Sequence, residues 1–217
     1  MNEKKEPETL SPHHILSTHR IEALTDGIFA FAMTLLVINL RFPDTARQSG
    51  LGLSSLLFGQ IQAFFDYFVS FFLLALFWVM HHQQFHHIRR SNASLLWVNI
   101  LLLSFIVLVP FSTSLTSDFD GQTPAEAFFA ANMFIIGLLF LVNWVYSTWQ
   151  RRFVDPTLED SFIAESTKLN LVIPAVSLLV FFLAFFIPHR SEYFYLLIPL
   201  FIYPRKYWYW HKKAPML

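Results

Sequence analysis

The sequence has no cysteine and few charged residues, and each shortage argues against certain classes of protein. Because the 217 residues include no cysteine, the chain cannot form disulfides, thiolate metal sites or thiol nucleophiles. Charged residues make up only 14% of the chain, whereas soluble domains typically have roughly 25%. The formal net charge is zero, so the charge balance does not indicate nucleic acid as a partner.

Apolar residues dominate what is there, at 55% of the chain, and they include 26 phenylalanines. Apolar stretches recur at residues 23–42, 63–80, 95–115, 128–146, 169–188 and 193–210. Each is close to the roughly 20 residues that a helix needs to cross a bilayer. The sequence therefore predicts an all-α integral membrane protein with six transmembrane helices. The last stretch is the weakest, because its uninterrupted apolar part ends near Tyr203.

The distribution of Lys and Arg predicts the orientation. Placing the N-terminus inside assigns twelve of the 15 basic residues to the cytoplasmic side and leaves Arg41, Arg47 and Arg190 outside. We therefore expect a multi-pass protein with both termini in the cytoplasm. Residues 1–19 would form a cytoplasmic N-terminal segment, residues 20–210 the transmembrane domain, and residues 211–217 a cytoplasmic tail.

The first helix differs from the others because it opens with charged residues. Arg20, Glu22 and Asp26 lie at or inside the membrane boundary, where an unpaired ion costs at least about 2.5 kcal/mol. They are either interfacial anchors or members of a buried polar cluster. The candidate partners from the second and third helices are Trp78, His81 and Asn99.

Farther along the same helix, Phe31, Leu35 and Ile38 recur at spacings of four and three and share one face. In a monomer such a stripe is ordinary helix packing. In a symmetric oligomer with this helix at the axis, it forms stacked apolar rings that gate by excluding water. The residues alone leave both interpretations open.

The first helix also carries a family resemblance. Its segments Thr25-Asp26-Gly27-Ile28-Phe29-Ala30 and Thr34-Leu35-Leu36-Val37 resemble the first-helix signature of the prokaryotic branch of the endosomal and lysosomal transmembrane potassium channel family. Residues 78–88 resemble the end of that family's second helix, and residues 95–111 resemble its third.

The resemblance implies a homotetramer in the cell membrane, with the first helix lining a pore for potassium and other monovalent cations. This pore would lack a carbonyl filter, and the chain contains no TVGYG-like segment. Carried over by position, the constriction and filter residues are Phe31, Thr34, Leu35 and Ile38. The structural polar network falls on Arg20, Thr25, Asp26, Trp78, His81 and Asn99.

Three positions depart from the family pattern, one of them conservatively, because Thr25 keeps the hydroxyl of the family's serine. Leu24 stands where the family has a phenylalanine, and Phe31 stands where a leucine or isoleucine is usual. A larger ring at Phe31 would either narrow the constriction or turn away from it.

A histidine cluster offers an alternative chemistry. His82 and His86 are four residues apart and could share a metal on one helix face. A structural His81 with solvated neighbours is the favoured interpretation, and we expect no metal and no cofactor. Glu126, Glu165 and Glu192 lie at helix ends and are interpreted, with the loop from Asp155 to Asp160, as solvated connections.

No segment resembles a nucleophile with its base or a phosphate-binding glycine loop, so an enzyme is not expected. The alternatives to a channel are a secondary transporter and, third, a histidine-box membrane metalloenzyme. A transporter would be expected to carry charged or helix-breaking residues at mid-membrane depth, where this chain has mainly Pro174.

Overall fold

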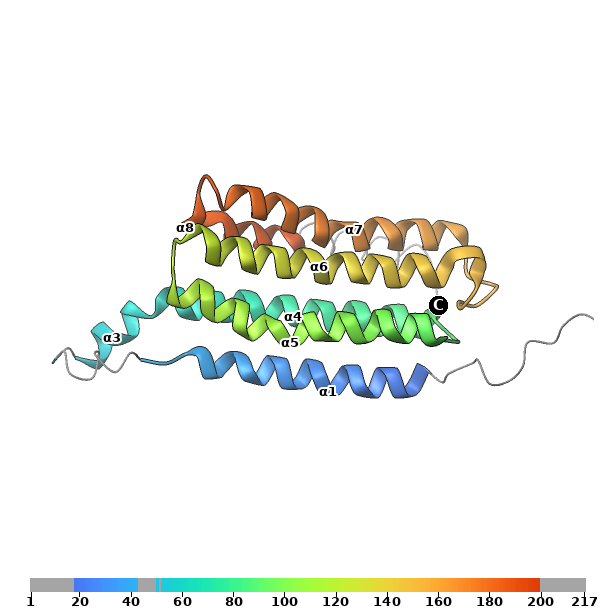
Figure 1. Cartoon of the computed structure of the whole chain (residues 1–217), viewed down its shortest axis with the longest axis horizontal. Coiled ribbons are helices and arrows are strands. Elements are labelled where there is room, and N and C mark those ends of the chain that lie inside the picture. Colours follow the sequence, from blue (N-terminus) through green and yellow to red (C-terminus); the bar gives the residue numbers. More distant parts are fainter. Residues whose placement is uncertain (1–17, 43–49, 51, 200–217) are drawn as a thin grey trace, which may run out of the picture.

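The computed structural model describes residues 18–42, 50 and 52–199, and long antiparallel helices make up most of this part (Figure 1). The long helices are α1 (Thr18–Leu36), α4 (Ile61–His87), α5 (Ala93–Asp118), α6 (Thr123–Thr148) and α7 (Asp160–Leu183). Shorter pieces connect or follow them: η2 (Val37–Asn39), α3 (Leu53–Gly59), η3 (Trp149–Arg151), α8 (Pro188–Ser191) and η4 (Glu192–Leu197).

The helices are layered in a simple order. In Figure 1, α1 lies along one edge of the bundle, α4 and α5 form the next layer, and α6 and α7 lie beyond them. α1 packs against both α4 and α5, and further contacts join α5 to α6 and α6 to α7. α1 is therefore a peripheral helix that rests on the bundle by one side.

Within the described residues, five helices are long and apolar enough to cross a membrane. With the 3₁₀ turns η2 and η3 counted as continuations of α1 and α6, these spans range from 22 to 29 residues, so the structure confirms a multi-pass helical membrane protein. The helices begin earlier or end later than most of the predicted apolar stretches, because polar residues at their ends still hydrogen-bond as helix. The sixth predicted stretch, 193–210, begins in η4, and its part beyond residue 199 lies outside the described residues.

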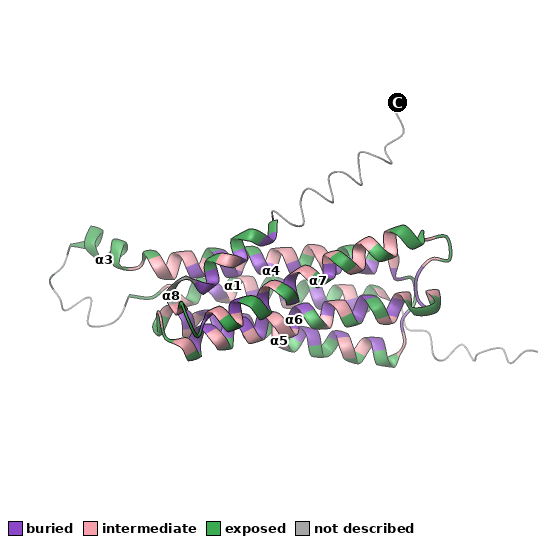
Figure 2. Ribbon diagram, turned by 90° about the horizontal axis from the view of Figure 1, so that it is seen from above, coloured by how far each residue is buried: buried purple, intermediate pink, exposed green. Residues whose placement is uncertain are grey.

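The core runs along the middle of the bundle, as the buried stripes in Figure 2 show. Phe77 of α4 and Phe140 of α6 stack at its centre with their ring centroids 5.4 Å apart. A smaller cluster, here called the end core, lies at the end of the bundle where α1 begins. It consists of Ile21, Phe85, Ile88, Leu95, Phe153 and Val154.

α6 and α7 approach each other closely at Gly137. A Cβ atom at this position would lie 2.7 Å from the Cδ atom of Pro174. Small residues permit this kind of backbone approach between membrane helices. Gly137 therefore allows the proline-containing segment of α7 to pack directly on α6.

Candidate functional site: the first helix and its polar anchors

α1 contacts the bundle through one face, and the other described residues leave its opposite face uncovered. Its buried residues recur at helical spacing: Ile21, Thr25, Phe29, Ala32 and Leu36. The predicted constriction residues lie mainly on the other side. Phe31 is 56% exposed and Ile38 is 45% exposed, Thr34 is also exposed, and Leu35 is half-buried.

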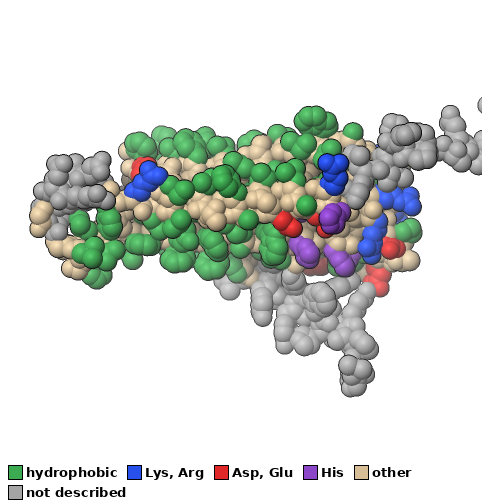
Figure 3. Space-filling view, turned by 90° about the horizontal axis from the view of Figure 1, so that it is seen from below, with side chains coloured by type: hydrophobic (Ala, Val, Ile, Leu, Met, Phe, Trp, Pro, Cys, Tyr) green, Lys and Arg blue, Asp and Glu red, His purple; other side chains and the backbone are tan. Residues whose placement is uncertain are grey.

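Figure 3 shows the side of the molecule on which α1 lies. Hydrophobic side chains spread over the middle of this side, charged side chains gather toward its two ends, and histidine side chains lie toward one of them. A contiguous apolar face of this kind suits contact with lipid or with another copy of the chain.

A buried polar triad joins α1 to α4 and α5. The Nε2 atom of His81 lies 2.9 Å from Asn99 Oδ1 and 3.4 Å from Thr25 Oγ1. The Asn99 amide donates to the Thr25 hydroxyl at 3.4 Å, so the three side chains close a ring. With Asn99 in this orientation, the Nε2 atom of His81 carries a proton and donates it to the amide oxygen.

A second contact lies beside the triad but nearer to the surface. The Trp78 indole donates to Asp26 Oδ1 at 2.8 Å, and both residues are exposed. Arg20 is exposed as well, and within the described part of the chain no hydrogen bond or ion pair joins it to this group. The structure thus brings Thr25, Asp26, Trp78, His81 and Asn99 together, and Arg20 stays apart. The functional role assigned to these residues remains a prediction.

The far end of α1 has an anchor that the sequence analysis missed. The Asn39 amide donates to the Pro110 carbonyl of α5 at 2.7 Å. Nearby, Arg41 Nε donates to the Ile38 carbonyl at 2.7 Å and caps the end of the helix. A polar amide directly after a long apolar run was the available signal, because such a group needs a partner near the membrane.

A second amide cluster was also missed. The Gln84 amide donates to Asn170 Oδ1 at 2.8 Å, and Asn143 donates to Gln84 Oε1 at 3.0 Å. These residues connect α4, α6 and α7 in the half of the bundle that also holds the triad. Amides inside otherwise apolar helices usually bond to a neighbouring helix, so their positions in the sequence could have indicated this contact.

The interpretation of Glu126 and Glu192 as solvated residues is wrong, because both are only 2% exposed. Glu126 accepts a hydrogen bond from Ser191 at 3.2 Å, and Gln62 donates to Glu192 at 2.5 Å and to Asp66 at 2.9 Å. These groups meet where α4 and α6 begin and η4 starts, so they turn inward toward one another. Burial, reinforced by the adjacent Asp66 carboxyl, raises the pKa of Glu192 above its usual range.

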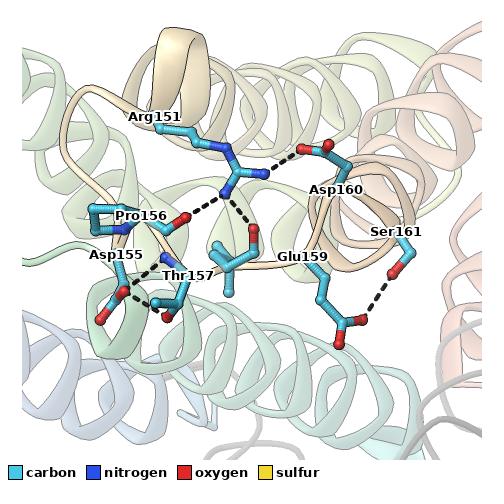
Figure 4. A network of polar contacts seen from close by, with 8 residues as sticks. Arg151, Asp155, Pro156, Thr157, Glu159, Asp160 and Ser161 are labelled. Carbon is cyan, nitrogen blue, oxygen red and sulfur yellow. Dashed lines mark hydrogen bonds and ion pairs between the residues drawn. The ribbon is translucent and has the colours of Figure 1, made fainter.

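The loop between α6 and α7 is an ordered network (Figure 4). Arg151 donates to the carbonyls of Pro156 and Leu158 and pairs with Asp160. These contacts hold Arg151 in a left-handed backbone conformation with φ of 55°. Hydrogen bonds from the Thr157 side chain and backbone lower the pKa of Asp155.

The histidine cluster divides by exposure. His81 is buried in the triad, His82 and His86 are exposed, and His87 is half-buried. Among the residues that the structure describes, no group of three or more His, Cys, Asp or Glu side chains is placed to hold a metal ion.

The fold and these anchors define a polytopic helical membrane protein whose first helix is fixed on one side and uncovered on the other. The family model described as "Endosomal/lysosomal potassium channel TMEM175" matches residues 20–110. A potassium channel of Chamaesiphon minutus is 30% identical over 171 residues, which cover 77% of this chain and 84% of the relative. The chain belongs to the TMEM175 family.

A second relative and a crystal structure agree with this assignment. A potassium channel of Streptomyces collinus is 29% identical over 158 residues, covering 71% of this chain and 75% of the relative. The crystal structure of a lysosomal potassium-selective channel TMEM175 homologue from Chamaesiphon minutus matches with a TM-score of 0.76 at 27% identity. That match covers 87% of this chain and 97% of the other. The family resemblance predicted from the first three helices is therefore confirmed.

Proposed function

We infer that the chain is a potassium-permeable channel, and we propose that the uncovered face of α1 lines its pore in a homotetramer. Membership of an ion-channel family and relatives named as potassium channels support the first part, and they agree with the prediction that the chain is not an enzyme. The observation that carries the second part is the division of α1 into a packed face and an exposed apolar face.

The exposed face has the composition of a constriction. Phe31, Leu35 and Ile38 would each contribute one side chain per subunit to a ring around the axis. Rings of bulky apolar side chains obstruct ions by excluding water, so conduction depends on their size and direction. The Thr34 hydroxyl donates to the Phe31 carbonyl at 2.8 Å, which leaves its oxygen lone pairs free to accept from water or approach a cation.

The packed face explains how such a pore would keep its shape. The buried triad holds α1 against α4 and α5 near its start, while Asn39 and Pro110 join its far end to α5. We propose that the helix ends carrying Arg89, Arg90, Arg151, Arg152 and Lys168 face the cytoplasm, in agreement with the positive-inside rule. We also propose that residues 193–210 form a sixth crossing, which returns the C-terminus to that side.

Ion flux through the purified protein in liposomes tests the proposal. We expect the wild type to pass potassium, and Leu35→Ala and Ile38→Ala to change the flux because each removes bulk from a ring. Leu179→Ala is the matched control, since Leu179 is a 49% exposed leucine on α7, away from α1. Native mass measurement should give four times the 25.4 kDa subunit mass.

Two results would contradict the proposal. Potassium flux that responds equally to Leu35→Ala and Leu179→Ala would show that α1 does not line the pathway. An intact tetramer that passes no potassium, but takes up a substrate with saturation, would favour a secondary transporter.

A further inference from the structure

The helix type changes at the outer constriction residue. α1 is α-helical to Leu36, and the chain then tightens into the 3₁₀ turn η2, which contains Ile38. The turn is closed by a hydrogen bond from the Leu40 amide to the Val37 carbonyl at 3.1 Å. Ile38, which would form the proposed outer ring, therefore lies on a 3₁₀ turn, whereas Phe31 and Leu35 lie on the α-helix.

This change alters the direction in which Ile38 points. An α-helix turns about 100° per residue, so two residues three apart are about 60° short of pointing in the same direction. A 3₁₀-helix turns about 120° per residue, so two residues three apart point in the same direction. Tightening the chain after Leu36 closes part of that gap. The 3₁₀ turn thus brings Ile38 toward the side of the helix on which Leu35 lies.

Short 3₁₀ segments have poorer hydrogen-bond geometry than α-helix and need support from their surroundings. The described residues supply it on one side, where Leu36 is 1% exposed and the Asn39 amide bonds to the Pro110 carbonyl. On the other side, Val37 and Ile38 are 53% and 45% exposed. Asn39 is thus the polar side chain that joins the 3₁₀ turn to the body of the subunit.

We infer that Asn39 is a positioning residue of the pore: by donating to the Pro110 carbonyl, it holds the 3₁₀ turn that directs Ile38, rather than Val37, toward the axis. The inference rests on the proposed function, because the axis is defined by the pore. The inference concerns the direction in which the Ile38 side chain points and not the type of residue at this position.

The cysteine-free sequence provides a direct test. Val37→Cys and Ile38→Cys are made one at a time in the full chain, in liposomes, and treated with a cationic methanethiosulfonate reagent. In the wild-type background we expect Ile38→Cys to react faster. With Asn39→Leu added, the ratio of the Ile38→Cys reaction rate to the Val37→Cys reaction rate should fall by about fivefold, the change expected for loss of one ordinary hydrogen bond. Asn39→Gln keeps an amide donor and should restore part of the preference.

Reaction is followed by mass as well as by potassium flux, so the ratio is measured even in a variant that conducts poorly. An unchanged ratio in Asn39→Leu would overturn the inference, because a merely structural Asn39 would lower thermal stability without rotating the turn. If Ile38→Ala changes the flux but Asn39→Leu leaves the ratio of the two cysteine reaction rates unchanged, only this inference fails. If Ile38→Ala leaves the potassium flux unchanged, the proposed pore itself fails.

Discussion

At the scale of single residues, the triad of Thr25, His81 and Asn99 shows why buried polar groups in a membrane helix come in sets. Each of the three hydrogen-bonds to the other two, and all are buried. An unpaired donor would cost more here than the hydrogen bond itself contributes, because the surroundings offer no water. Replacing any one of the three by an apolar residue therefore removes a hydrogen-bond partner from each of the other two.

Asn99→Leu should destabilise the subunit by about 1–3 kcal/mol, because it leaves the His81 ring without its best acceptor in a buried position. Trp78→Phe is the comparison, since it removes an exposed hydrogen bond to Asp26 and should cost only about 0.5 kcal/mol. Thermal unfolding in detergent micelles measures both. Equal losses for the two variants would contradict the buried role of the triad.

Glu192 predicts a pH dependence of stability. Its pKa in the folded protein is raised above the ordinary value of 4.5, mainly by burial. The folded chain therefore holds a proton that the unfolded chain releases, so the stabilisation is complete at acidic pH and is lost as the pH rises toward the folded pKa. Glu192→Gln resembles the protonated form and should flatten this decline.

The measurement is the melting temperature of the two proteins from acidic to alkaline pH, compared at equal detergent concentration. A wild type that becomes more stable as the pH rises, relative to Glu192→Gln, would contradict the direction of the shift. Glu165→Gln serves as a control, because the Glu165 side chain is partly exposed beside Lys168 and should leave the profile unchanged.

At the scale of elements, the contact between α6 and α7 depends on one missing side chain. Gly137→Ala would place a methyl group 2.9 Å from the backbone nitrogen of Pro174, where neither partner can move without shifting a helix. Such overpacking typically costs about 1–3 kcal/mol. We expect Gly137→Ala to lower the melting temperature in detergent micelles.

Gly27→Ala is the matched control, because nothing lies within 4 Å of a Cβ atom built at Gly27. The same change of residue inside a helix should there be neutral or slightly stabilising for the subunit, since alanine is the better helix former. A similar loss of stability in both variants would show that the close approach of α6 and α7 is not what Gly137 provides.

At the scale of the whole molecule, the apolar runs predicted the class of fold because a span of about 20 residues is imposed by the bilayer itself. The spacing in α1 also predicted which residues share a face. The sequence could not predict that Glu126 and Glu192 turn inward, since a carboxyl at a helix end suits either water or a buried partner. For Asn39, the position after a long apolar run indicated that the amide needs a partner, but no sequence pattern identifies that partner as the Pro110 carbonyl.

The end core has a mechanical consequence for α1. Ile21 packs there with Ile88 from the connection after α4 and with Phe153 from the loop after α6. The Arg89 amide also bonds to the Phe153 carbonyl at 2.8 Å, so these two connections are tied to each other. A shift at the start of α1 would therefore repack both connections, whereas at its other end Leu36 is buried in the main core and the Asn39 amide donates to the Pro110 carbonyl of α5. If α1 lines a pore as proposed, we therefore expect a change in pore width to move the Asn39 end of α1 more than its Ile21 end.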